Sequence, residues 1–301
     1  MDIKENIILP AWKLVKDDAK IKKIYFFPGL LSILFLTWLL VYQSIYTYVN
    51  IFNKKDEVLV LMLDFFHSGY FIETIITALI FLFLHLFVVP VFEGGLISYI
   101  DEKNKTQERV SFSDVIGVGV YRFLPLFEYN NFSQFKIISV LNAYLFTIRF
   151  IGLEYMGYVT YVFLVVFFFS IVAHLLFAYS KYEIVLKTGK VLKSISKSAK
   201  ITILNPKMTI QLYFMMILLN IRVIFNFLIF LFFPIIIFSA IFYITSKFFL
   251  IITLIFLISL FLIFIVFLGY FASVMEVFKI AIWYYAYIEG EKKIAMYKDD
   301  E

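Results

Sequence analysis

The chain has 301 residues, of which 63% are hydrophobic, 21% aromatic and only 16% charged, and its net charge is +5. Soluble globular proteins average about 45–50% apolar and about 25% charged residues, so this composition excludes a soluble protein. The 39 Phe and 21 Tyr exclude an intrinsically disordered chain as well. The absence of Cys excludes disulfides, thiolate nucleophiles and Cys-ligated zinc or iron–sulfur sites. What remains is a membrane protein with several spans.

The apolar residues form long runs without the period-2 alternation of a transmembrane barrel, and such runs predict helices. A hydrocarbon core about 30 Å thick needs about 20 apolar residues per helix. We therefore predict an all-α, polytopic transmembrane bundle with six spans, at about residues 29–49, 71–92, 137–153, 160–179, 209–231 and 248–270. Residues 232–246 contain Pro234 and are predicted to be a kinked extension, an interfacial segment or part of a seventh span.

The basic residues are distributed unevenly between the two sides of this arrangement. Of the 27 Lys and Arg, 22 lie before span one, between spans two and three, between spans four and five, or after span six. Cytoplasmic loops are enriched in Lys and Arg, so we expect an even number of spans, both termini in the cytoplasm and location in the cytoplasmic membrane. The first apolar run is too long for a signal peptide, so we expect it to stay in the mature protein.

Each outgoing hairpin is preceded by a segment whose pattern predicts an amphipathic helix at the cytoplasmic interface, at residues 8–24, 113–125 and 190–204. For the second we predict Ser113 as the N-cap and an end at Pro125. For the third we predict an apolar stripe of Leu192, Ile195 and Ala199. The residues predicted to contact lipid headgroups are Trp12, Lys13, Lys16, Lys20, Lys193, Lys197 and Lys200. Residues 271–301 are predicted to form a cytoplasmic tail.

The chain thus repeats one pattern three times, an interfacial helix followed by two spans. This pattern resembles bacterial and archaeal six-span membrane families related to the membrane domain of glycerophosphoryl diester phosphodiesterases. The matching residues are Trp12, Phe27-Pro28, Gly94-Gly95, Ser111-Phe112-Ser113-Asp114, Ser194, Ser198 and Asn205. The soluble catalytic barrel of those phosphodiesterases, with its His and Glu motifs, is absent from this sequence. The resemblance implies an architecture and supplies no established activity.

Motifs for nucleotides and metals are weak. Gly117-Val118-Gly119 lacks the third glycine of a dinucleotide-binding loop and lies in a predicted amphipathic helix, so helix packing or a hinge is the favoured interpretation. His67 lies three residues after Asp64, with no third ligand nearby in the sequence. We expect neither a metal site nor a cofactor. No basic patch accompanies a soluble nucleic-acid module, so nucleic acid is not an expected partner.

Ionisable residues inside the predicted spans are the remaining candidates for function. His85 and His174 lie about 21 Å from the outer boundary at 1.5 Å per residue, so they could meet, either as a packing contact or in a proton relay. Arg149 and Arg222 lie about 18–20 Å from the cytoplasmic side. Glu73 and Glu154 lie within side-chain reach of that level. These four are predicted to form a charge-balanced structural cluster or, alternatively, a site for a lipid phosphate or small anion.

No nucleophile and base can be paired in this sequence, so we do not expect an enzyme, and an intramembrane hydrolase is the least favoured class. The sequence favours a non-catalytic membrane scaffold or accessory component, with anionic lipid headgroups and other membrane proteins as partners. The alternative is a permease for a small molecule or anion, because repeated hairpins and intramembrane charges are typical of transporters.

Overall fold

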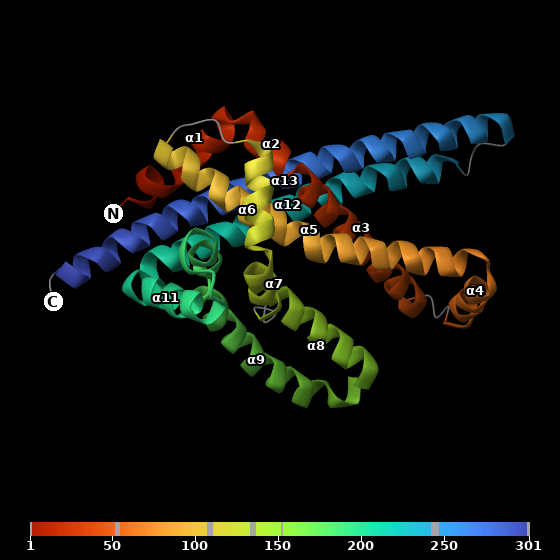
Figure 1. Cartoon of the computed structure of the whole chain (residues 1–301). Coiled ribbons are helices and arrows are strands. Elements are labelled where there is room, and N and C mark those ends of the chain that lie inside the picture. The colour runs from red at the N-terminus through yellow and green to blue at the C-terminus, as the bar shows by residue number, and fades with distance from the viewer. Residues whose placement is uncertain are drawn as a thin grey trace. The chain divides into compact units, whose positions relative to one another are not determined.

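The computed structural model describes residues 2–51, 55–106, 111–132, 137–151, 153–241 and 247–299, and every element in these ranges is helical (Figure 1). The predicted all-α class is therefore confirmed. The longer helices are α3 (Phe26–Ile51), α4 (Lys55–His67), α5 (Tyr70–Thr106), α8 (Ile137–Ile151), α9 (Met156–Leu176), α11 (Val191–Leu204), α12 (Pro206–Ile241) and α13 (Lys247–Asp299). The shorter ones are η1 (Lys4–Ile8), α1 (Leu9–Asp17), α2 (Ala19–Ile24), α6 (Phe112–Tyr121), α7 (Phe123–Phe132), η2 (Leu153–Tyr155), α10 (Ser180–Glu183) and η3 (Ile184–Thr188).

Three of the described helices are long and apolar enough to cross a membrane, at Tyr70–Lys105, Met156–Lys187 and Ile251–Tyr297. A fourth candidate is α11 together with the first part of α12, which meet at a bend of 102°. In the most apolar stretches of α5 and α9 only 6% of the residues are buried within the protein, as lipid-facing helices require. The structure thus supports three or four spans, and six remain a prediction.

The shortest and the longest of the span helices differ in length from the spans predicted for them. The 15 residues of α8 extend about 22 Å, less than the roughly 30 Å of a hydrocarbon core. By contrast, α5 has 37 residues and α13 has 53, about 56 and 80 Å, so each continues well beyond the length that a bilayer needs. Residues 232–241 continue helix α12, which agrees with the extension, one of the three alternatives predicted for residues 232–246. Residues 242–246 lie outside the described ranges.

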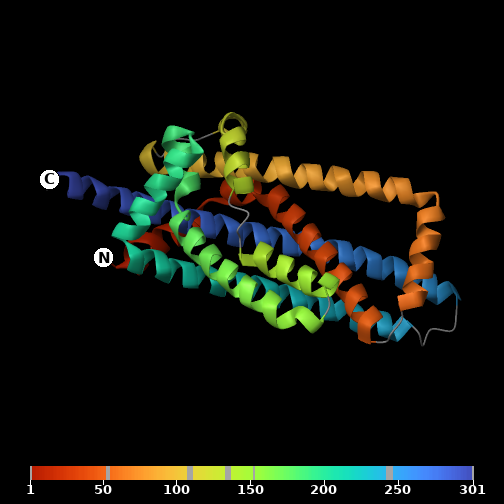
Figure 2. The ribbon, with the colours of Figure 1, turned by 90° about the horizontal axis from the view of Figure 1, so that it is seen from below.

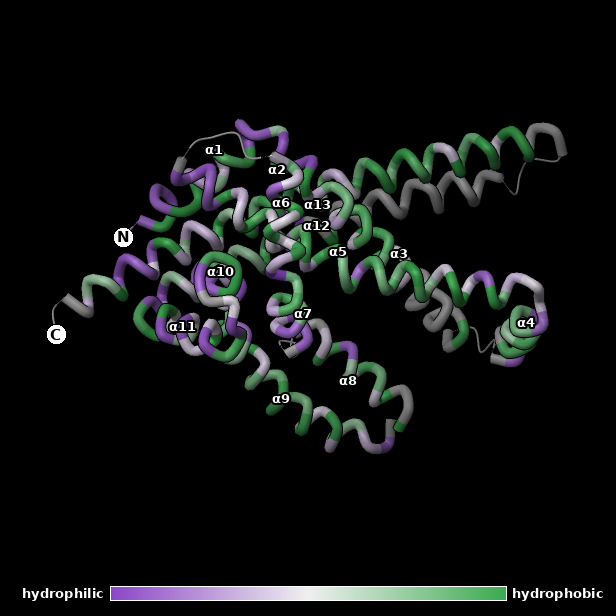
Figure 3. Tube along the Cα trace, in the orientation of Figure 1, coloured by the Kyte–Doolittle hydropathy of each residue, from purple (hydrophilic) through white to green (hydrophobic). Residues whose placement is uncertain are grey.

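The chain divides into two compact units, each described by itself. Unit 1 comprises residues 1–21, 90–220 and 277–301, and unit 2 comprises residues 22–89 and 221–276. The helices α5, α12 and α13 contribute to both. Polar residues are frequent on α1, α10, α11 and the C-terminal end of α13, whereas the unit 2 part of α5 is predominantly apolar (Figure 3).

The C-terminal part of α13 forms the core of unit 1. Between residues 277 and 287 its buried side chains are Val277, Ile280, Ala281, Ile282, Tyr284, Ala286 and Tyr287, of which Ala281, Ile282 and Tyr284 are at 0% exposure. On α5, the residues Leu96, Ile97 and Ile100 are buried to the same extent. Within the predicted tail, residues 277–299 are therefore the last part of α13 and contribute buried side chains to unit 1, and their cytoplasmic location stays a prediction.

Close helix packing in unit 1 depends on glycines of α5 and α6. A Cβ atom at Gly119 would collide with the backbone carbonyl of Val91, and one at Gly95 would collide with that of Val115. The packing interpretation of Gly119 is thus confirmed, whereas a Cβ atom at Gly117 would have no neighbour within 4 Å.

The boundaries of the second predicted interfacial helix need correction. The N-cap is Ser111, whose hydroxyl accepts a hydrogen bond from the Ser113 backbone N–H at 3.1 Å. The Asp114 carboxylate accepts one from the Ser111 N–H at 3.3 Å and completes a capping box. Pro125 does not end the helix. A break occurs at Arg122, and Pro125 lies in the first turn of α7, where its missing N–H costs no helical hydrogen bond.

The third predicted interfacial helix has the predicted extent but a different buried face. Asn205 ends α11 and Pro206 begins α12, as expected. Leu192, however, is 72% exposed, and the buried face carries hydroxyl groups instead. Ser198 donates to the carbonyl of Leu176 at 2.6 Å, and Thr202 donates to that of Leu175 at 3.0 Å. These bonds satisfy carbonyl groups at the C-terminus of α9, which have no partner in their own helix.

The helices α8 and α9 form an antiparallel hairpin within unit 1 (Figure 2). The hydroxyl groups of Tyr144 and Thr160 share a hydrogen bond of 2.9 Å across it. In unit 2, α3 packs on α13 where both have small residues. Ser273 of α13 donates to the Phe26 carbonyl at 3.3 Å, and a small apolar cluster of Ile33, Leu268 and Ala272 lies beside it.

Candidate functional site

Among the described residues of unit 1, three carboxylates are buried, and all three have the same kinds of partner. Asp18, Asp101 and Glu183 are 6%, 9% and 1% exposed. Each accepts a hydrogen bond from one tyrosine hydroxyl and forms an ion pair with one lysine. We call this arrangement the carboxylate clamps, comprising Asp18–Tyr99–Lys103, Asp101–Tyr284–Lys105 and Glu183–Tyr287–Lys197.

The first clamp joins the N-terminal helices to α5. Asp18 lies at the break between α1 and α2, where its extended backbone ends the predicted helix 8–24 early. Its carboxylate accepts hydrogen bonds from Tyr99 at 2.6 Å and from the Lys20 N–H at 2.9 Å, and it pairs with Lys103. Burial alone would raise the pKa of Asp18, but these hydrogen bonds and the charge of Lys103 bring the pKa below its usual value. The carboxylate is therefore held in its charged form.

The second clamp joins α5 to α13. Tyr284 donates to one oxygen of Asp101 at 2.9 Å, and Lys105, one turn along α5, pairs with the other at 2.6 Å. The two aspartate clamps therefore use residues on neighbouring turns of α5. This placement fixes the C-terminal part of α5 between the N-terminal helices and α13.

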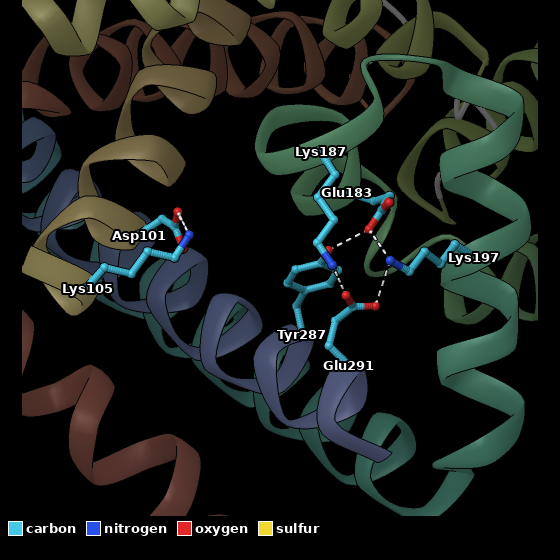
Figure 4. Close-up of polar contacts among 7 residues, drawn as sticks. All are labelled: Asp101, Lys105, Glu183, Lys187, Lys197, Tyr287 and Glu291. Atoms are coloured by element: carbon cyan, nitrogen blue, oxygen red, sulfur yellow. Dashed lines mark hydrogen bonds and ion pairs between the residues drawn. The ribbon is translucent and has the colours of Figure 1, made fainter. Parts of the chain in front are cut away.

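The third clamp is part of a larger network (Figure 4). Tyr287 donates to Glu183 at 2.5 Å, and Lys197 of α11 lies 3.1 Å from the same oxygen. Lys197 also pairs with Glu291 of α13 at 2.9 Å, and Glu291 pairs with Lys187 of η3. Two lysines and two glutamates thus join α10, η3, α11 and α13. A further pair, Lys181 with Glu93, joins α10 to α5.

The chemistry of these clamps favours a structural role. At Asp18 the lysine and the hydrogen bonds hold the pKa below its usual value, so this carboxylate is a weak base. The tyrosine hydroxyl keeps its proton in its hydrogen bond to the carboxylate and is a poor nucleophile. Together the clamps tie α5, α10, α11 and α13 to one another and to the break between α1 and α2.

The predicted intramembrane residues are placed as follows. The side chains of Arg222, Glu73 and Glu154 are exposed, and no ion pair among the described side chains joins Arg222 to Glu73. The side chain of Arg149 lies outside the described part. His85 stacks on Phe35 with ring centroids 5.4 Å apart, and His174 contacts Tyr213 edge-on at 5.3 Å. The predicted arginine cluster and histidine pair stay predictions.

The predicted headgroup-binding residues divide into two groups. Six are exposed, as that role requires: Trp12, Lys13, Lys16, Lys20, Lys193 and Lys200. Lys197 differs, because it points into the protein and pairs with Glu183 and Glu291. Across the described residues no group of three or more His, Asp or Glu side chains could hold a metal ion.

Sequence analysis did not identify the clamp tyrosines or their carboxylates. A signal was nevertheless present in α13, where Tyr284, Tyr287 and Glu291 follow helical spacing at i, i+3 and i+7. On α5, every second position over two turns is polar at the end of an apolar run, at Tyr99, Asp101, Lys103 and Lys105. Residues 99 and 103 share one face of α5 and residues 101 and 105 nearly the opposite one, and neither pattern predicts the partners that these faces meet. Comparison with protein-family models, curated proteins and solved structures finds no match for this chain.

Proposed function

We propose that this chain is a non-catalytic scaffold or accessory component of the cytoplasmic membrane, with six spans and both termini in the cytoplasm. The carboxylate clamps carry the proposal. Every buried carboxylate of unit 1 in the described residues is paired with a lysine and accepts a hydrogen bond from a tyrosine of another segment, so these groups link helical segments to one another. The exposed apolar faces of α5 and α9 give lipids and other membrane proteins a large lateral surface.

A permease is the second candidate, and one observation favours it. The helices α11 and α12 meet at 102° around Asn205, and transporters use such discontinuous helices to form binding sites. Polar groups at this break already have hydrogen-bond partners within unit 1. The Thr209 hydroxyl donates to the Asn205 carbonyl at 3.1 Å and shares a hydrogen bond of 2.9 Å with the Tyr179 hydroxyl.

Proteoliposome flux measurements distinguish the two candidates. The full chain would be reconstituted into vesicles that contain a dye sensitive to pH, phosphate or chloride, and the imposed gradient of the matching ion would be followed. For a scaffold we expect the gradients to decay at the same rate as in vesicles that contain the heat-denatured chain. A faster decay that Thr209→Val slows, with Thr188→Val as a control substitution, would support the permease and contradict the scaffold.

A further inference from the structure

The helix α1 has two faces with different surroundings. Ile7, just before it, and Ala11 and Val15 within it are buried at 0%, 0% and 2% exposure, and they follow a spacing of four residues. This face attaches α1 to unit 1. Trp12 lies outside this buried face, because its side chain is 53% exposed.

The outward face of α1, defined here as Leu9, Trp12, Lys13 and Lys16, combines apolar and basic side chains. Leu9 is 48% exposed, and both lysines are exposed as well. These residues lie at i, i+3, i+4 and i+7 and so share one side of the helix. The indole of Trp12 contacts the ring of Phe278 edge-on, with centroids 5.6 Å apart, so its position is fixed by the C-terminal helix.

The two lysines on this face differ from the lysines that hold unit 1 together. Lys103, Lys105, Lys181, Lys187 and Lys197 each pair with a carboxylate. Within the described ranges, neither Lys13 nor Lys16 has such a pair. Their positive charges therefore remain available to a negatively charged partner outside the chain.

We propose that the outward face of α1 binds the interfacial layer of an anionic phospholipid membrane. Tryptophan and leucine would enter the boundary between headgroups and acyl chains, and the two lysines would contact lipid phosphates. In the sequence only α2 lies between α1 and the first apolar helix, α3. This inference rests on the proposed membrane function and assigns the expected contact with anionic lipid to one face of α1.

Fluorescence quenching by brominated lipids tests the inference on the full chain. Trp12 becomes the sole tryptophan in the variant Trp38→Phe/Trp283→Phe, since the sequence has 3 Trp. The protein would be reconstituted in mixed phosphatidylcholine and phosphatidylglycerol vesicles in which one lipid or the other carries bromine. We expect Trp12 to be quenched more strongly by brominated phosphatidylglycerol. Each lysine near an anionic surface changes partitioning about fivefold, so Lys13→Gln/Lys16→Gln should abolish most of this preference.

The control is Lys207→Gln/Lys293→Gln, which removes the same charge from unit 1 at positions outside the predicted headgroup contacts and should leave the preference unchanged. Raising the salt concentration to about 1 M should also weaken it, since the screening length falls to about 3 Å. If the double tryptophan variant does not fold, Leu9→Cys labelled with an environment-sensitive dye provides a second reporter, because the chain has no other Cys.

Two results would overturn the inference. Equal quenching by both brominated lipids would show that anionic headgroups are not recognised, and no quenching by either would place this face outside the membrane. Carbonate extraction separates these results from a failure of the proposed function. A chain that stays in the carbonate-washed membrane is still an integral membrane protein, whereas release of the whole chain would contradict the proposed function itself.

Discussion

Lys197→Met should lower the free energy of unfolding by about 2–4 kcal/mol, because it removes one partner from a buried ion-pair network. The carboxylate of Glu183 would keep only the Tyr287 hydroxyl, although its side chain is 2% exposed. Glu291 would keep only Lys187. The loss would be measured as a lower midpoint of thermal unfolding in mild detergent.

Lys193→Met is the matched control, since Lys193 is exposed one turn earlier in α11 and should tolerate the same substitution. The triple variant Glu183→Leu/Tyr287→Phe/Lys197→Met should recover much of the lost stability, because it removes the stranded carboxylate together with its partners. A loss from Lys197→Met no larger than that from Lys193→Met would show that the third clamp does not hold unit 1 together.

Gly119→Ala should destabilise the contact between α5 and α6 by about 1–3 kcal/mol, the usual cost of adding a methyl group to a closely packed interior. The new Cβ atom would collide with the backbone carbonyl of Val91, and a backbone atom cannot move aside as a flexible side chain can. Thermal unfolding of the full chain in the same detergent would measure the change.

The comparison with Gly117→Ala makes this test specific. Gly117 lies in the same helix, two residues earlier, but its added methyl group would meet nothing within 4 Å. Alanine is a better helix former than glycine by about 1 kcal/mol, so Gly117→Ala should be neutral or slightly stabilising. Equal destabilisation by the two substitutions would refute the proposed role of Gly119 in close packing.

The helical class and the position of the main helices could be predicted from the sequence, because apolar runs of this length have few other possible structures. Each of the six predicted spans falls largely within a helix of the structure. The end of α13 could not be predicted in the same way. Its residues from Val277 onward mix charged and aromatic side chains, and their burial depends on contacts with distant segments.

The buried face of α11 shows why hydrophobicity alone was misleading. Leu192 and Ile195 predicted the inward side, but the carbonyl groups at the end of α9 need hydrogen-bond donors, and Ser198 and Thr202 provide them. This tertiary requirement outweighs the apolar stripe, because an unpaired buried carbonyl group costs about 1–3 kcal/mol. In the sequence, this buried face is indicated only by Ser194, Ser198 and Thr202, which recur every four residues in α11.

The candidate site was missed for a related reason. Sequence analysis looked for ionisable residues inside apolar spans, where a charge is costly and therefore informative. The clamps lie instead where long helices continue past their apolar parts, and Asp101 and Glu183 pair with tyrosines 183 and 104 positions away in the chain. Spacing within one helix carries no information about such partners.

Single-cysteine accessibility mapping tests the central claim most directly, because the chain has no native Cys to remove. In intact cells, a membrane-impermeant thiol reagent should label cysteines placed at Lys55, at the start of α4, and at Glu154, in the turn between α8 and α9. It should not label a cysteine at Lys298 near the end of α13 until the membrane is permeabilised. This result would establish an outward-facing α8–α9 turn and a cytoplasmic C-terminus. Labelling at position 298 in intact cells would contradict the six-span account.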